Sequence, residues 1–330
     1  MNVSYGWPCR IRRKLLATLA IVALSTAASA CGSTAPSGPG TPDDSEAPAP
    51  LSAGGHETVR YCSGESMLLT APDSSGIRPA VLFVHGGDWM GGNLEETGFI
   101  DHLRPALNQA GFVVAAINYR LAPRYKAPAQ AVDTACALRY LRAWARPLGI
   151  DPHEIGAWGD SAGGQLVSLA ATAPRSAGFF VGPYQQQSNR PQAVVDMYGI
   201  VDLPAEVRYL RTLQGGDKLA ASQIARIIGS ASTTEAGEDL VQLSPVTYVS
   251  PGDPPFLILQ GTADTIAPPS QSEDLAAKLH AAGVPVQLVL VTGGQHGLET
   301  PGERPSEPQL VHQVVEWFSG ELDGSHGSAG

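Results

Sequence analysis

Short apolar runs that alternate with longer helical segments constrain the fold of this chain more than any other feature. A strand buried on both faces of a sheet is a continuous apolar run, and strands that alternate with helices form a mostly parallel sheet. The expected strands are Ala80–Val84, Phe112–Ile117, Ile155–Trp158, Ala193–Tyr198, Phe256–Gln260 and Val286–Val291. The expected helices are Phe99–Ala110, Gln130–Ala145, Ala162–Ala173, Pro269–Ala282 and Pro308–Phe318. The pattern predicts an α/β fold with a mostly parallel central sheet and helices on both faces.

Antiparallel edge strands are expected around Val59 and from Met67 to Ala71. Two connections, 174–191 and 203–255, are longer than ordinary loops of a compact domain. Long connections of this kind are usually functional, so both are predicted to form a small cap.

The segment Gly159-Asp160-Ser161-Ala162-Gly163 lies where the expected strand Ile155–Trp158 gives way to a helix. A serine hydroxyl is a weak nucleophile at neutral pH, so it must project from a tight turn where a base can reach it. The flanking glycines permit such a turn sterically. The pattern predicts that Ser161 is a nucleophile, although these five residues alone also fit an ordinary glycine-rich loop.

A second glycine segment, His85-Gly86-Gly87-Asp88-Trp89, follows the expected strand Ala80–Val84 directly. Acyl transfer builds negative charge on a carbonyl oxygen, and one preorganised N–H donor is worth about 3–4 kcal/mol to its transition state. The candidate donors are the backbone N–H groups of Gly87, Asp88 and Ala162. A plain glycine-rich turn is the alternative. The residues expected to support this loop are His85, Gly86 and Trp89.

Four segments together resemble the α/β-hydrolase superfamily, in particular its hormone-sensitive-lipase-like and bacterial feruloyl-esterase-like carboxylesterases. They are His85–Trp89, Asn118–Pro123, Gly159–Gly164 and the pair of loops that hold Asp264 and His296. In one departure, Asp88 stands where hormone-sensitive-lipase relatives have a third glycine, which is closer to feruloyl-esterase-like and kynurenine-formamidase-like members. The resemblance implies an α/β-hydrolase fold and a serine esterase that needs no cofactor.

The acid and the base are predicted at strand exits, where active-site groups of open parallel sheets lie. Asp264 follows the strand Phe256–Gln260, and His296 follows the strand Val286–Val291. The chain order Ser161, Asp264, His296 is the order expected of this fold. Asp202 is a competing acid because it also follows an expected strand, and Asp264 could instead cap the next helix.

The leading functional hypothesis is an exported serine carboxylesterase that hydrolyses small to medium esters. An arylformamidase-like amide hydrolase and a catalytically silent surface binding protein on the same fold are the alternatives. The net charge of −10 disfavours a nucleic-acid partner. No His-Glu-x-x-His motif or other ligand spacing occurs, so neither a metal nor a cofactor is expected. Nothing in the sequence indicates the oligomeric state.

The first thirty residues are predicted to be a signal peptide. A basic segment, Arg10 to Lys14, precedes an apolar stretch from Leu15 to Ala30 that is shorter than the ~20 residues of a membrane span. Cys31 follows directly, as in bacterial lipoproteins, so it is the expected lipidation site and the only expected membrane contact. Simple secretion with an incidental Cys31 is the alternative, and Arg12-Arg13 also allows twin-arginine export. The expected location is extracytoplasmic.

Residues 31–55 are rich in proline, glycine and serine and are predicted to be a tether. The catalytic domain is expected over 56–320, and the last residues, 321–330, are expected to be a disordered tail. Once Cys9 leaves with the signal and Cys31 is lipidated, Cys62 and Cys136 remain. These two could form a disulfide, or Cys136 could be a buried free thiol; the sequence leaves both open.

Overall fold

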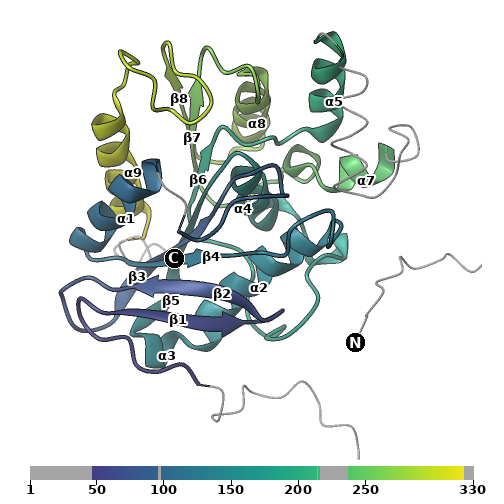
Figure 1. Cartoon of the computed structure of the whole chain (residues 1–330). Coiled ribbons are helices and arrows are strands. Elements are labelled where there is room, and N and C mark those ends of the chain that lie inside the picture. Colours follow the sequence, from purple (N-terminus) through teal and green to yellow (C-terminus); the bar gives the residue numbers. More distant parts are fainter. Residues whose placement is uncertain (1–46, 96–97, 214, 216–236, 323–330) are drawn as a thin grey trace, which may run out of the picture. The chain divides into compact units, whose positions relative to one another are not determined.

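The computed structural model describes residues 47–95, 98–213, 215 and 237–322 (Figure 1). The predicted signal peptide 1–30, Cys31 and most of the tether lie outside the described residues. So do 216–236, within the second long connection, and 323–330, within the expected tail.

The described strands form one sheet in the order β1-β2-β4-β3-β5-β6-β7-β8. The strands are β1 His56–Tyr61, β2 Glu65–Thr70, β3 Arg78–Val84, β4 Val113–Ile117, β5 Ile150–Asp160, β6 Val194–Met197, β7 Phe256–Gly261 and β8 Val286–Val291. β1 and β2 pair antiparallel and β2 pairs antiparallel with β4, whereas every pair from β4 to β8 is parallel. The predicted α/β fold and its antiparallel edge are therefore confirmed.

Helices cover both faces of the sheet, with α1 and α9 on one face and α2, α4 and α8 on the other (Figure 1). The helices are α1 Phe99–Gln109, α2 Ala129–Ala143, α3 Ala145–Leu148, α4 Ala162–Thr172, α5 Leu203–Thr212, α7 Gly237–Gln242, α8 Ser270–Ala281 and α9 Glu307–Leu322. Short 3-10 turns are η2 Arg175–Ala177 and η3 Pro245–Thr247. Within the described part of the chain, no helix combines the length and the apolar character needed to cross a bilayer.

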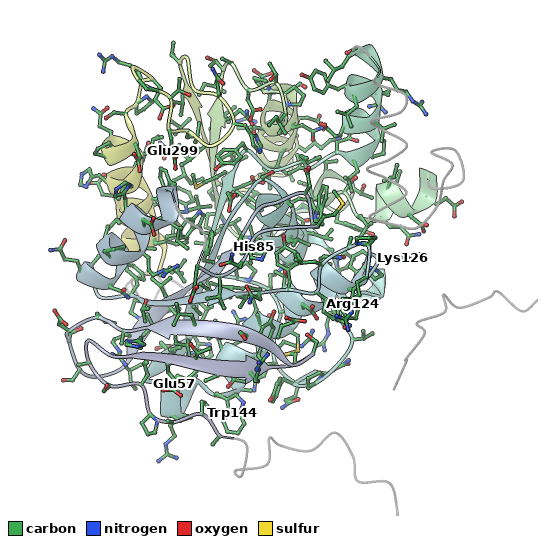
Figure 2. All side chains as sticks on the ribbon, in the orientation of Figure 1. Glu57, His85, Arg124, Lys126, Trp144 and Glu299 are labelled. Carbon is green, nitrogen blue, oxygen red and sulfur yellow. A yellow bond between two sulfur atoms is a disulfide. The ribbon has the colours of Figure 1, made fainter. Side chains whose placement is uncertain are left out.

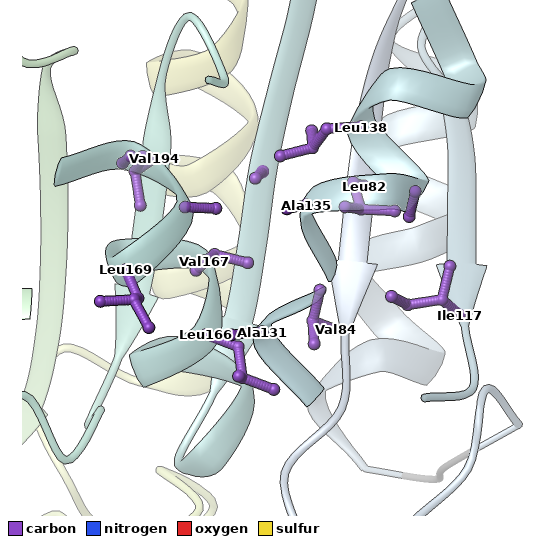
Figure 3. Packing of buried hydrophobic residues seen from close by; sticks show 14 of the residues in the cluster. Leu82, Val84, Ile117, Ala131, Ala135, Leu138, Leu166, Val167, Leu169 and Val194 are labelled. Atoms are coloured by element: carbon purple, nitrogen blue, oxygen red, sulfur yellow. The ribbon is translucent and has the colours of Figure 1, made fainter. Parts of the chain in front are cut away.

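The core has two layers because successive side chains of a strand point to opposite faces. In β3, Ala80, Leu82 and Val84 pack in the layer with α2 and α4, and Val81 and Phe83 pack in the layer with α1 and α9. Figure 3 shows part of the first layer, in which side chains from β3 and β4 lie beside those of α2 and α4. Burial on both faces explains why the strands are continuous apolar runs.

The site is positioned by the place of β3 in the sheet. β3 lies between β4 and β5, so the strand order changes direction there, and ligands of open α/β sheets bind at such switch points. The loop after β3 and the turn after β5 consequently emerge side by side.

Both predicted ends of the domain were wrong by a few residues. Leu51 is 8% exposed and belongs to the core, and the N–H of Gly54 donates to the carbonyl of Pro72 at 2.8 Å. At the other end α9 continues to Leu322, which is 3% exposed. One leucine at each end adds buried apolar surface, although the segments around it are rich in small and polar residues.

The first long connection, 174–191, does not form the predicted cap. Its carbonyls at Ser188 and Arg190 accept hydrogen bonds from the guanidinium of Arg142 at 2.9 and 2.7 Å. The same guanidinium donates to the carbonyl of Pro152, near the amino end of β5, whereas Ser161 follows the carboxyl end of that strand. This connection therefore covers the end of α2 that lies away from the site.

The second long connection does contain helices beside the carboxyl ends of the strands. α5 buries Leu203, Val207 and Leu210, and the hydroxyl of Tyr209 donates to the carbonyl of Thr265 at 2.8 Å. That hydrogen bond ties α5 to the loop that follows β7.

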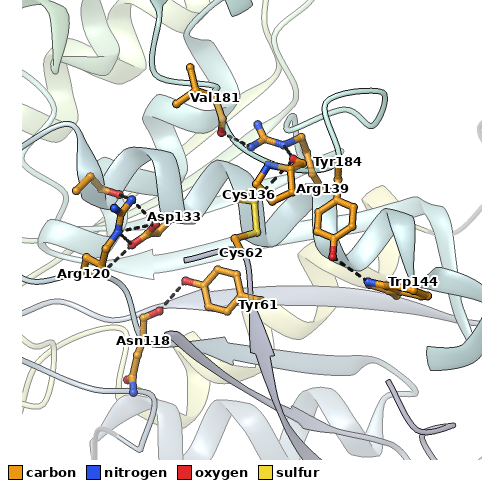
Figure 4. The surroundings of a disulfide bond; sticks show 12 residues. Tyr61, Cys62, Asn118, Arg120, Asp133, Cys136, Arg139, Trp144, Val181 and Tyr184 are labelled. Carbon is orange, nitrogen blue, oxygen red and sulfur yellow. Dashed lines mark hydrogen bonds and ion pairs between the residues drawn. A yellow bond between two sulfur atoms is a disulfide. The ribbon is translucent and has the colours of Figure 1, made fainter. Parts of the chain in front are cut away.

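A disulfide joins Cys62, in the turn after β1, to Cys136 in α2 (Figure 4). Of the two alternatives left open by the sequence, the structure therefore has the pair and not the free thiol. Close by, the hydroxyl of Tyr61 donates to the carbonyl of Asn118 at 2.6 Å. Both contacts fasten the edge hairpin to the body of the domain.

Replacing Cys62 and Cys136 together by serine is expected to lower the free energy of unfolding by about 4 kcal/mol. The two cysteines are 74 positions apart, so loss of the cross-link returns the entropy of a long open loop to the unfolded chain. Urea unfolding of the wild type and the double variant measures the difference. Reduced wild type is the control and should match the variant; equal stabilities of the oxidised and the reduced wild type would contradict the prediction.

Candidate active site

The three predicted triad residues meet at the carboxyl edge of the sheet. The hydroxyl of Ser161, after β5, donates to Nε2 of His296, after β8, at 3.0 Å. Nδ1–H of His296 donates to Oδ2 of Asp264, after β7, at 2.8 Å. The competing acid, Asp202, instead caps α5 and accepts the N–H of Ala205 at 2.8 Å.

The carboxylate of Asp264 is held by its own loop. Asp264 is 4% exposed, and its Oδ1 accepts the backbone N–H groups of Ile266 and Ala267 at 2.8 and 3.0 Å. Gln260 donates to Oδ2 at 3.3 Å and is itself held by the hydroxyl of Ser272 at 2.7 Å. These bonds fix the orientation of the carboxylate and aim its second oxygen at His296. We did not single out Gln260 from the sequence. It could have been recognised there as a polar residue at the end of an otherwise apolar strand.

Ser161 lies on a strained turn. Its φ of +51° is in the left-handed region, which costs a non-glycine residue about 1–3 kcal/mol, and its N–H donates to the carbonyl of Met197 at 2.8 Å. A Cβ on Gly163 would lie 1.9 Å from the carbonyl oxygen of Val84, so the first turn of α4 packs directly on the end of β3. The glycine is required by this close approach, which places the nucleophile beside the loop after β3.

Three successive positive φ angles shape the loop after β3, the candidate oxyanion loop. Gly87, Asp88 and Trp89 have successive φ values of +96°, +55° and +59°. The N–H groups of Met90 and Gly91 close the turn by donating to the carbonyl of Gly87 at 2.9 and 2.8 Å.

Two of the three candidate donors have an N–H group that donates to no acceptor within the described part of the protein. Within the described residues, the N–H groups of Gly87 and Ala162 donate to no backbone or side-chain acceptor. The N–H of Ala162 is one of the unpaired donors at a helix N-terminus, where the helix dipole also favours negative charge. These groups flank Ser161 and suit a developing oxyanion.

The predicted supporting residues brace this loop. The indole N–H of Trp89 donates to Gln165 at 2.9 Å. The ring of His85 stacks on Tyr119 with centroids 4.2 Å apart, and the tyrosine hydroxyl donates to the carbonyls of His85 and Gly86 at 3.0 Å. Burial lowers the pKa of His85 to about 4, so its ring is neutral at pH 7. His85, labelled in Figure 2, is buried and acts as a brace and not as the base.

A cavity of about 360 Å³ opens beside Ser161 and His296. Its apolar wall includes Phe83, Phe99, Ile100, Trp158 and Met197. Three carboxyl residues, Asp88, Asp160 and Glu299, also line it, and Figure 2 shows Glu299 on the loop between β8 and α9. Within the described residues, no group of three or more His, Cys, Asp or Glu side chains is placed to hold a metal ion.

Tyr198, which we did not single out from the sequence, lies against the base. Its ring centroid is 4.6 Å from that of His296, and its own φ is +43°. This contact restricts the orientation of the His296 ring, which the sequence pattern alone does not determine.

A Ser, Asp and His in this chain order, joined by hydrogen bonds at the carboxyl edge of a mostly parallel sheet, define the α/β-hydrolase class. The chain belongs to the BD-FAE family, which matches residues 68–279. The resemblance inferred from the sequence motifs is thereby confirmed.

Several similar proteins are ester hydrolases or esterases by name. A probable carboxylic ester hydrolase, LipM, from Mycobacterium tuberculosis is 30% identical over 251 residues, which is 76% of this chain and 56% of LipM. An ethyl acetate hydrolase from Pseudomonas putida is 30% identical over 66% of this chain and 65% of its own length. This chain therefore spans about half to two thirds of these curated relatives. The solved structure of a truncated carbohydrate esterase from gut microbiota has a TM-score of 0.68 and 25% identity, over 84% of this chain and 99% of that one.

The contrast between Asp264 and Asp202 predicts the effect of two matched substitutions on the reactivity of Ser161. Asp264→Asn is expected to slow phosphonylation of Ser161 by a fluorophosphonate about 10³-fold or more, because the amide no longer stabilises the imidazolium. Asp202→Asn should leave the rate near that of the wild type, since asparagine also caps a helix. Labelling rates followed by mass spectrometry measure both. If Asp202→Asn slows the phosphonylation of Ser161 and Asp264→Asn does not, Asp202 and not Asp264 would be the acid of the triad.

Proposed function

We propose that this protein is a serine carboxylesterase that works through an acyl-serine intermediate. The observation that carries the proposal is the unbroken chain of hydrogen bonds from Asp264 through His296 to Ser161, at the edge of an open cavity. The names of the relatives, ester hydrolases and esterases, support the same chemistry.

In the first half of the reaction, Oγ of Ser161 bonds to the carbonyl carbon of the ester, and its proton passes to Nε2 of His296. The carbonyl oxygen takes the electron pair and is stabilised by the N–H groups of Gly87, Asp88 and Ala162. The carbon–oxygen bond to the alcohol then breaks, and the leaving oxygen receives the proton from His296. Asp264 stays ionised and stabilises the imidazolium throughout.

In the second half, a water molecule gives one proton to His296 while its oxygen bonds to the acyl carbon. The bond to Ser161 breaks, Oγ recovers the proton from His296, and the carboxylic acid leaves. The cycle needs no group beyond the triad, the backbone donors and water.

The cavity favours uncharged esters of small to medium size. Apolar side chains form one wall, whereas the carboxyl groups of Asp88, Asp160 and Glu299 disfavour an anionic substrate at close range. An uncharged formamide would also fit, so amide hydrolysis is tested beside ester hydrolysis.

Purified wild type is expected to hydrolyse p-nitrophenyl esters, fastest with short acyl chains, and to carry a fluorophosphonate adduct on Ser161. Ser161→Ala should lose about 10⁴-fold or more of the turnover, because triad members act as a unit. Ser319→Ala, an exposed serine on α9, is the matched control and should keep full turnover.

N-formylkynurenine, assayed in parallel with p-nitrophenyl acetate, distinguishes the arylformamidase alternative. Faster turnover of the formamide would replace the esterase proposal. Absence of both an adduct and any turnover in a folded protein would favour the binding-protein alternative.

We further propose that the enzyme works outside the cytoplasm and is anchored by a lipid on Cys31. The basic and apolar start of the chain supports export, and the Cys62–Cys136 disulfide fits an oxidising compartment.

Expression of the full chain with a C-terminal tag in a lipoprotein-processing bacterium is expected to place the protein in the membrane fraction, with Cys31 as a lipidated first residue. Cys31→Ser should move it out of that fraction because the anchor is lost. Fractionation and mass spectrometry of the N-terminal peptide measure both. An unmodified N-terminus at Cys31 in a soluble extracytoplasmic protein would favour simple secretion instead.

A further inference from the structure

A carboxyl oxygen without a hydrogen-bond partner is buried beside the active site. Glu206, on α5, is 4% exposed, and within the described residues its Oε2 accepts no hydrogen bond. Its side chain lines a cavity of about 30 Å³, enough space for one or two water molecules. The cavity wall is mostly apolar and includes Trp89, Ala131, Leu166, Val207 and Leu240. Buried carboxyl oxygens normally accept hydrogen bonds, so one that accepts none, in a side chain that lines a cavity, needs an explanation.

The surroundings keep Glu206 protonated. Burial, followed by the negative charges of Asp264 and Asp88, raises the pKa of Glu206 to about 8. These charges come from the loops after β7 and β3, and Tyr209, on the same helix, also interacts with Glu206. At neutral pH Glu206 is therefore mainly the uncharged acid, and its O–H is a hydrogen-bond donor.

The position of this cavity relative to the triad indicates which part of an ester it would meet. His296 must lie next to the leaving oxygen, so the alcohol occupies the larger cavity that His296 lines. An acyl chain then points to the other side of Ser161. Two residues of the smaller cavity's wall lie close to the nucleophile along the chain: Trp89 follows the candidate donor Asp88, and the N–H of Gln165 donates to the carbonyl of Ser161 at 3.1 Å.

We propose that Glu206 is a specificity-determining residue of an acyl subsite, where its O–H donates a hydrogen bond to an uncharged oxygen on a short acyl chain. The inference rests on the proposed esterase function. The oxygen of a hydroxy-acyl or keto-acyl group accepts a hydrogen bond from the O–H of Glu206. A plain alkyl group has no such acceptor and leaves this O–H without a partner. An acyl chain that ends in a carboxylate meets the charges of Asp88 and Asp264 and is disfavoured.

The test compares kcat/KM for ethyl 3-oxobutyrate and ethyl butyrate, which share the alcohol and the chain length and differ in one carbonyl oxygen. The readout is the ratio of the two values, measured on the full chain. Glu206→Leu is expected to lower this ratio about tenfold, the loss of roughly one hydrogen bond. Glu206→Gln should keep most of the ratio because its amide also donates. Asp202→Asn, at the cap of the same helix, is the control and should leave the ratio unchanged.

The pH dependence separates a hydrogen bond to substrate from a merely structural role. The acid form of Glu206 is present below its pKa of about 8, so the wild-type ratio should fall as the pH rises through 8. In Glu206→Gln the ratio should stay constant from pH 6 to 9. A structural role would change both esters equally and leave the ratio unmoved.

Equal ratios in the wild type and Glu206→Leu would overturn the inference. If Glu206→Leu does not fold, Glu206→Gln provides the test. A kcat/KM ratio of the two esters that still falls near pH 8 in this variant would overturn the inference. Wild type that hydrolyses neither ester would contradict the proposed function itself, and the inference with it. Turnover of both esters with an unmoved ratio would contradict the acyl subsite alone.

Discussion

The contact between the first turn of α4 and the end of β3 is the constraint on which the whole site depends. No Cβ fits at Gly163, where it would lie 1.9 Å from the carbonyl oxygen of Val84. Because the two backbones touch, Ser161 and the N–H of Ala162 lie beside the segment that contains Gly87. A larger residue at position 163 would separate the nucleophile from the oxyanion donors, even with every catalytic side chain present.

The site contains several buried carboxyl groups whose surroundings give them different chemistry. Asp264 accepts two backbone N–H groups and remains an acceptor for His296. Asp196, in β6, accepts hydrogen bonds from Ser168 and the N–H of Gly199, yet burial still raises its pKa to about 6. Oε2 of Glu206 accepts no hydrogen bond within the described residues, and the pKa of this group rises to about 8. Burial raises the pKa of both Asp196 and Glu206; hydrogen bonds from Ser168 and Gly199 oppose the rise at Asp196, whereas the charges of Asp264 and Asp88 add to it at Glu206.

Prediction from the sequence succeeded where the signal was local and failed where distant contacts decided. The apolar runs gave β3 to β8 within a few residues, except that β5 begins earlier, at Ile150, because it pairs with Arg78. The connection 174–191 has the length of a cap, but its place follows from its hydrogen bonds with Arg142, which no pattern reveals. Leu51 and Leu322 extend the domain for the same reason, since packing partners far along the chain bury them.

The sequence by itself determined the class of fold and the order of the triad, because periodicity and strand-exit motifs are local properties of the chain. Only the tertiary structure decided between Asp264 and Asp202, which both follow strands but differ in what they accept. It also decided that Cys62 pairs with Cys136 and that Oε2 of Glu206 is buried without a hydrogen bond from any described residue. Each of these depends on which segments come together in space, and the strand order across the sheet sets that arrangement.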